Sequence, residues 1–232
     1  MSLYLALEIV AIVVPLLFSY DRKLQFFLKL KSVMLSLLFV GSFYVVGDIL
    51  FTKYGIWGFN PKYHSGILIF DLPLEEWMFF IVIPYASIFL HDTLIYLFPS
   101  QKLSDRYTKA ASLVLVLFLT ICVLLNLDKA YTSLYLSVAI LAIVLCYLFS
   151  PTILSRFYLT FLIILIPFFL VNSVLTGSFI AEPVVWYNNA ENLGIRILTV
   201  PVEDISYAFS LILFNLIGIS KLDSIMQPKP LK

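Results

Sequence analysis

Seven apolar stretches of this chain are each long enough to cross a lipid bilayer as a helix, which takes about 20 residues. Hydrophobic residues make up 62% of the 232 residues and charged residues 12%, and this composition excludes a soluble domain or a basic, nucleic-acid-binding surface. We therefore predict an all-α integral membrane protein with no nucleic-acid partner. The seven expected transmembrane helices are 3–20, 32–53, 76–98, 107–126, 131–149, 156–176 and 204–220.

The positions of the basic residues favour one orientation of this bundle. With the N-terminus outside, eleven of the 15 lysines and arginines fall on the cytoplasmic side, and an excess of basic residues is typical of cytoplasmic loops. We expect a multi-pass protein of the cell membrane, with its N-terminus outside and its C-terminus in the cytoplasm. No basic region precedes the first apolar stretch, so we expect a retained helix and not a cleaved signal peptide.

An internal repeat divides the chain into two halves. A shift of 128 positions aligns GILIFDLPLEEWMFF (66–80) with GIRILTVPVEDISYA (194–208) without a gap. Further upstream, a four-residue insertion in the second copy places Asp48 opposite Asn172. Repeats of this length indicate two copies of one structural unit.

Each copy of the repeat contains three of the predicted helices. Three helices lie between the first and the fifth, so the copies cross the membrane in the same direction, and an axis along the membrane normal relates them. We predict parallel three-helix repeats, helices 1–3 and 5–7, joined by helix 4. The expected boundaries are 1–106 for the first repeat, 107–129 for the connecting helix and 130–232 for the second repeat.

Adjacent acids open the last helix of each copy: Glu75 and Glu76 in the first, Glu203 and Asp204 in the second. Acidic residues are common in first helical turns, so a helix start is the simplest interpretation. Asp48, however, lies inside an apolar stretch, where an ionisable group costs at least about 2.5 kcal/mol and is a functional candidate. All five acids fall in the outer part of the predicted bundle, which predicts a site for a proton, a cation or a developing carbocation.

Burial of these carboxyl groups predicts a general acid. Burial disfavours the charged form, so we expect at least one protonated carboxyl at neutral pH. In a dry pocket such an acid can protonate a membrane-soluble molecule such as a polyene, and aromatic faces stabilise the resulting cation by about 0.5–2 kcal/mol each. No cofactor or metal is expected, because no nucleotide-binding, zinc-binding or Cys/His motif occurs. The expected substrate-binding residues are Trp57, Phe59, Trp77, Phe79, Phe80, Asn172, Trp186, Tyr187 and Tyr207.

The motif LPLEEWMFF, its echo VPVEDISYA, and the preceding GIWGFNP and VVWYNNAENLGI resemble the membrane-embedded lycopene cyclase family. This is the non-flavin type, found as heterodimeric subunits in some bacteria and as a fused domain in archaea and fungi. The resemblance covers nearly the whole chain, as both tandem cyclase domains on one polypeptide. The second copy reads P-V-E-D where the family has P-x-E-E, and its aromatic pair is reduced to Tyr207 and Ala208. The halves are therefore expected to be unequal.

The resemblance implies a cofactor-independent lycopene cyclase, a redox-neutral intramolecular lyase or isomerase. An acid protonates the end of a linear carotene, a six-membered ring closes through a carbocation, and a base removes a proton; a ring of the beta type is expected. Glu75 and Glu203 are the preferred proton donor and cation-stabilising groups, with Glu76, Asp204 and Asp48 as proton acceptor or supporting groups. The implied partners are lycopene or a similar carotene, the lipid bilayer and other enzymes of carotenoid biosynthesis.

Three other functions fit parts of the sequence. A seven-helix retinal protein needs a lysine within a helix, and the last expected helix has none before Lys221 at its end. A proton- or cation-coupled transporter of a small or lipophilic solute also uses acids at a repeat interface, and is the main alternative. A structural partner of carotenoid enzymes would tolerate the loss of every acid.

Overall fold

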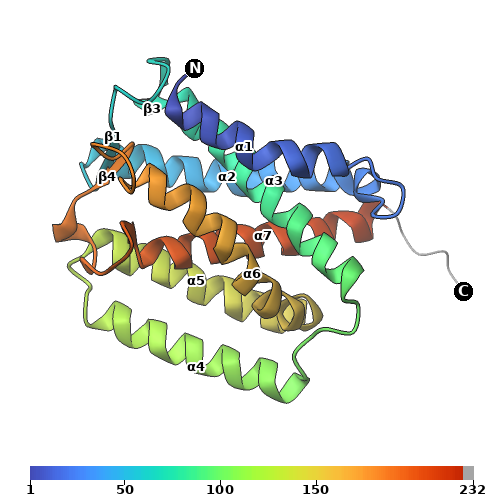
Figure 1. Cartoon of the computed structure of the whole chain (residues 1–232). Helices are drawn as coiled ribbons and strands as arrows, with labels where there is room; N and C mark the ends of the chain where they lie inside the picture. The colour runs from blue at the N-terminus through green and yellow to red at the C-terminus, as the bar shows by residue number, and fades with distance from the viewer. Residues whose placement is uncertain (227–232) are drawn as a thin grey trace, which may run out of the picture.

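Seven α-helices account for most of residues 1–226, the part of the chain that the computed structural model describes (Figure 1). Six of them are long and apolar enough to cross a membrane, and the predicted all-α membrane fold is confirmed. The end of the predicted second repeat, and Lys229 and Lys232 of the charge count, lie outside the described residues. The helices are α1 (Leu3–Phe18), α2 (Leu30–Lys53), α3 (Leu74–Leu97), α4 (Asp105–Leu124), α5 (Ala130–Phe149), α6 (Pro151–Leu175) and α7 (Glu203–Met226).

Helix α1 is shorter than its predicted span. Its 16 residues extend about 24 Å, whereas a bilayer core is about 30 Å thick. The helix ends at Phe18, and the next residue, Ser19, is held in place: its hydroxyl lies 2.7 Å from the carbonyl of Pro15 and 2.5 Å from the hydroxyl of Tyr85 on α3. The short 3-10 helix η1 (Phe26–Lys29) then leads into α2.

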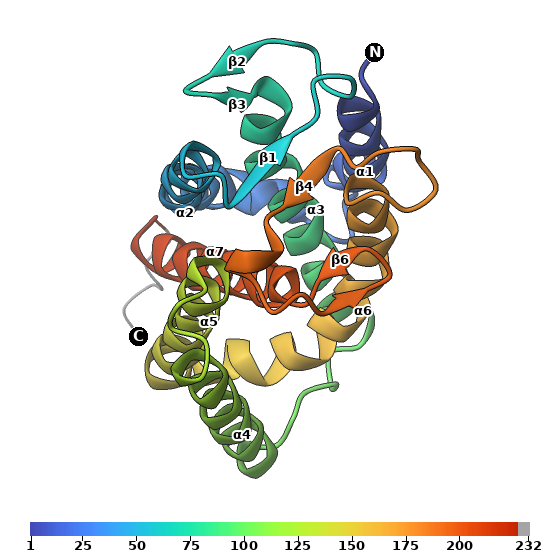
Figure 2. The same ribbon diagram turned by 90° about the vertical axis from the view of Figure 1, so that its left-hand side faces the viewer.

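The helices are arranged in two matching halves around α3 and α7. Seen from the end in Figure 2, α1 and α6 lie together on one side, and α2 and α5 lie on the other. Helix α4, which joins the halves, packs on α5 at the outside of the bundle. The core residues Val33, Phe157 and Leu213 are fully buried between α2, α6 and α7.

Short hairpins precede α3 and α7 and follow the repeat. Strand β2 (Leu68–Ile69) pairs with β3 (Leu72–Pro73), and β5 (Arg196–Ile197) pairs with β6 (Val200–Pro201), each 128 positions later. The two prolines thus end the hairpins, Pro73 directly before α3 and Pro201 one residue further from the start of α7 at Glu203. The 3-10 helix η2 (Asn189–Glu191) lies in the loop before β5.

The axis that relates the two halves passes through a third strand pair. Strand β1 (Trp57–Phe59) pairs antiparallel with β4 (Val185–Tyr187), so that Gly58 faces Trp186, and these two residues are 128 positions apart. A residue on such an axis faces its own counterpart. A large side chain fits there only if its counterpart is small, and a Cβ atom on Gly58 would lie 2.4 Å from the Trp186 ring.

We expect Gly58→Ala to lower the free energy of unfolding by at least about 1 kcal/mol, because overpacking forces the Trp186 ring out of place. Thermal unfolding of the purified protein in detergent measures this change. Gly58→Ala combined with Trp186→Ala removes the clash and should recover most of the loss. Gly41→Ala is the matched control, since its Cβ would lie 3.6 Å from Phe80, an ordinary contact; equal effects of Gly58→Ala and Gly41→Ala would contradict the expectation.

Candidate active site

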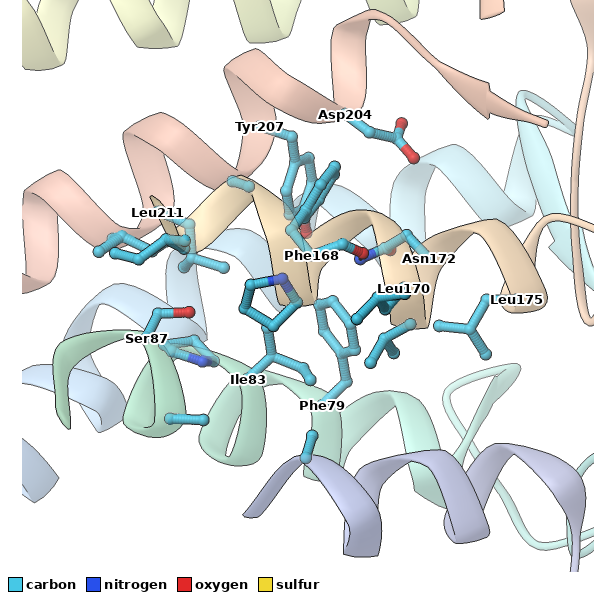
Figure 3. Close-up of a pocket in the computed structure, with 18 of the residues that line it drawn as sticks. Phe79, Ile83, Ser87, Phe168, Leu170, Asn172, Leu175, Asp204, Tyr207 and Leu211 are labelled. Carbon is cyan, nitrogen blue, oxygen red and sulfur yellow. The ribbon is translucent and has the colours of Figure 1, made fainter. Parts of the chain in front are cut away.

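A cavity of about 430 Å³ lies between α1, α3, α6 and α7. Its walls are almost entirely apolar, and in Figure 3 Phe79 on α3 and Tyr207 on α7 project into it from opposite sides. Its carboxyl groups are Asp48, Glu76 and Asp204, which are at most 6% exposed. The structure thus brings acids from α2, α3 and α7 to one apolar space.

In the first half, the two adjacent acids have separate surroundings. Glu76 lines the cavity and accepts a hydrogen bond of 2.5 Å from the hydroxyl of Tyr4 on α1. Glu75 does not line it: its carboxylate accepts from the hydroxyl of Ser2 at 2.7 Å and from the backbone N–H of Ser65 at 2.6 Å. Glu75 therefore ties the N-terminus and the long loop to the start of α3.

The second half repeats this arrangement. Asp204 lines the cavity and accepts a hydrogen bond from the hydroxyl of Tyr131 on α5. Glu203 accepts from the hydroxyl of Thr132 at 2.6 Å and from the backbone N–H of Leu193 at 2.7 Å. Successive helical residues point about 100 degrees apart, so in both halves the second acid faces the cavity and the first holds the loop.

Asp48 and Asp204 receive further hydroxyl groups. Tyr207 donates to Asp48 at 3.1 Å, and Tyr187 on β4 donates to the second oxygen of Asp204 at 3.0 Å. Burial, followed by the neighbouring Asp204, raises the pKa of Tyr187 well above its ordinary value. Tyr187 therefore keeps its proton at neutral pH and remains a donor to the carboxylate.

The expected aromatic residues divide into two groups. Trp77 donates its indole N–H to the carbonyl of Ile69 in the hairpin at 3.2 Å, Phe80 is buried in the core, and Trp186 lies over Gly58. These three point elsewhere because they occupy other faces of the helix or strand. The cavity is lined by the rest of the expected set: Trp57, Phe59, Phe79, Asn172, Tyr187 and Tyr207.

Tyr4 and Tyr131 were not predicted from the sequence, although each donates to a cavity acid. They lie in the first turns of α1 and α5 and are 127 positions apart. The repeat shift is 127 for this pair, 124 for Asp48 and Asn172, and 128 for the acidic motif, so the ungapped alignment ends before them. An alignment that allows both gaps identifies them as an equivalent pair.

Comparison with known proteins identifies two related regions in the chain. A family model described as Lycopene cyclase matches residues 1–94 and, separately, residues 128–222. The two matched regions contain the two acidic motifs, and α4 lies between them. No curated protein and no solved structure matches the chain.

Proposed function

The chain belongs to the lycopene cyclase family, and from this premise we propose that it closes an acyclic end group of a linear carotene by acid catalysis, without a cofactor. The observation that carries the proposal is the convergence of Asp48, Glu76 and Asp204 on one apolar cavity. A hydrocarbon substrate offers no polar handle, so an apolar wall binds it and buried acids supply the chemistry.

The reaction is an isomerisation in three steps. A carboxylic acid adds its proton to the terminal double bond of the carotene and leaves a tertiary carbocation. The next double bond attacks this cation, which forms the carbon–carbon bond of a six-membered ring and moves the positive charge onto the ring. A carboxylate then removes a ring proton, which leaves the double bond of a beta-type ring. No electron is gained or lost overall.

The hydrogen bonds support different roles for Glu76 and Asp204. Both oxygens of Asp204 accept from phenol groups, Tyr131 and Tyr187, and hydrogen bonds to a carboxylate favour its charged form. We assign Asp204 to stabilising the cation and accepting the proton. Glu76 accepts a single phenol hydrogen bond, from Tyr4, and is assigned as the proton donor.

Asp48 and the aromatic walls complete the assignment. Asp48 faces the same cavity and is assigned as a supporting group, and the rings of Tyr207 and Phe79 line the cavity, where each can stabilise a cation by about 0.5–2 kcal/mol. This assignment reverses the sequence-based preference, which gave the proton-donor and cation-stabilising roles to the first acid of each pair. Glu75 and Glu203 are assigned to holding the loops, because they bind loop and helix-start groups outside the cavity wall.

The proposal also covers the setting of the enzyme. The site lies at the end of the bundle that carries the strands. We assign this end to the outer side of the cell membrane and the C-terminus to the cytoplasm, an orientation that the distribution of basic residues supports. The repeats are assigned to 1–106 and 130–232, with 107–129 as the connector. Lycopene or a similar linear carotene arrives through the bilayer from other enzymes of carotenoid biosynthesis.

Expression of the intact chain in a bacterial host that accumulates lycopene tests this function. We expect the extracted pigment to contain cyclised carotene, identified by chromatography and absorption spectra, because the host supplies the substrate and no cofactor is required. The host with an empty vector is the control. Lycopene that stays unchanged beside well-expressed, membrane-inserted protein would refute the proposal.

A further inference from the structure

Two equivalent gaps between helices are expected from the repeat, but the cavity occupies one of them. The two halves place α1 beside α6 on one side of the central pair α3 and α7, and α5 beside α2 on the other (Figure 2). The cavity lies on the α1–α6 side, although Glu76 and Asp204 are equivalent acids and both face it. This difference bears on how the substrate enters, and the inference drawn from it rests on the proposed function.

Small residues keep the α1–α6 side open, and larger ones fill the equivalent positions on the α2–α5 side. Three alanines line the cavity, and each corresponds in the repeat to a bulkier residue that packs in the core. Helix α1 aligns with α5 at a shift of 127, and α3 with α7 at a shift of 128. The matched pairs are Ala11 and Val138, Ala86 and Phe214, and Ala208 and Phe80.

Tyrosine side chains complete the closure of the α2–α5 side. Tyr135 on α5 stacks on Tyr44 of α2, with ring centroids 5.9 Å apart, and lies 4.4 Å from the ring of Tyr207. Tyr44 is fixed in turn by a hydrogen bond of 2.7 Å to Ser210 on α7. Gly47 leaves room for the Tyr135 hydroxyl, since a Cβ there would lie 2.9 Å from it. The gap equivalent to the cavity is thus occupied by the protein itself.

The open side has a mouth that faces lipid. Val14 on α1 and Leu170 on α6 line the cavity and are nonetheless 58% and 69% exposed. Nearer the strands, Tyr4 and Leu175 pack together in a buried cluster, which closes that end of the same gap. Val14 lies ten residues beyond Tyr4, or about 15 Å deeper along the helix. The opening is therefore lateral, at membrane depth.

The size of the cavity requires such an opening. An engineered cavity of about 150 Å³ holds one benzene ring, so 430 Å³ accommodates one end of a linear carotene and not its full length. The remainder must leave the protein through an apolar route.

We infer that a linear polyene enters from the bilayer between α1 and α6, places one end group at the acids, and leaves its remaining length in lipid, while the α2–α5 gap admits no substrate. The two halves therefore form one chamber that works on one end at a time. Glu76 comes from the first repeat and Asp204 from the second, and both face the open side, while the closed α2–α5 side supplies rigid tyrosines.

Tryptophan substitutions at equivalent exposed positions test the route. Val14 corresponds to Leu141 on α5, which is 51% exposed and does not line the cavity. We expect Val14→Trp to reduce cyclised product about tenfold or more, because the indole obstructs the mouth. Leu141→Trp adds the same ring to the same kind of surface and should stay within about twofold of the unmodified chain. Leu170→Trp and its counterpart Val46→Trp form a second matched pair.

A binding measurement separates entry from chemistry. Each tryptophan is also placed in an Asp204→Asn chain, which is purified from the lycopene-accumulating host, and the retained lycopene is measured by absorbance per mole of protein. If Val14→Trp and Leu170→Trp lose the retained lycopene and their two controls keep it, the route is supported. This holds even if the intact chain forms no ring and the proposed function fails. Normal product and normal retention with both variants, or equal losses in the Leu141→Trp and Val46→Trp controls, would overturn the route and leave the proposed function intact.

Discussion

Asp204→Asn should lower the yield of cyclised carotene by about 10²–10⁴-fold, the contribution expected of a positioned acid or base. The side chain lines the cavity, and both of its oxygens accept hydrogen bonds from tyrosines. Asparagine keeps the size but has no charge to stabilise a cation and no basic oxygen to take a proton. Pigment extracted from the lycopene-accumulating host, normalised to the amount of membrane-inserted protein, gives the measurement.

The adjacent Glu203 provides the matched control. Glu203→Gln keeps an oxygen that can accept from Thr132 and from the backbone N–H of Leu193. We therefore expect only a partial loss of product, together with a loss of stability of about 1–3 kcal/mol from the weakened contacts to the loop. Glu76→Gln and Glu75→Gln should repeat the same contrast in the first half. Abolition of cyclisation by the Glu203 and Glu75 variants, with product retained in Asp204→Asn and Glu76→Gln, would contradict the assignment.

Most of the fold could be predicted from the sequence because the membrane imposes a simple rule on helix length and composition. The predicted spans 32–53 and 131–149 end where α2 and α5 end. The shift of 128 positions predicted that the segments before α3 and α7 would be alike, and the two hairpins confirm it. The predicted span 3–20 is two residues longer than α1, which ends at Phe18, directly before the polar segment SYDRK.

The chemistry of the site could be predicted, but its geometry could not. Two adjacent acids predict an acidic helix start, but the pair alone does not indicate which of the two side chains faces the cavity. The orientation of α3 is set by packing that is distant in sequence, such as the contact of Tyr4 with Glu76 across 72 positions. The closure of the α2–α5 gap depends on side-chain size at matched positions, for example Ala208 and Phe80. The effect of such a size difference can be interpreted only when the positions of the two repeats in space are known.

Glu8→Leu should raise the free energy of unfolding by about 3 kcal/mol, the upper end of the cost of unsatisfied buried polar atoms. Glu8 lies on α1 one turn after Tyr4 and is 1% exposed, and within residues 1–226 neither of its carboxyl oxygens has a hydrogen-bond partner. A buried carboxyl without a partner destabilises the folded state whether it is charged or neutral. Leucine removes that cost, and the neighbouring Leu7 already packs in an apolar cluster.

The equivalent position in the other half supports this expectation, because α5 has Tyr135 where α1 has Glu8, and Tyr135 is well packed there. Thermal unfolding in detergent measures the change, with Glu8→Gln as the control that keeps the unsatisfied polar atoms and so should gain little. A loss of stability in Glu8→Leu would contradict the expectation and show that Glu8 has a partner in the membrane. A gain in stability with a fall in cyclised product would show that the chain keeps this costly acid because the adjacent site uses it, which is a common reason for strain beside a reaction centre.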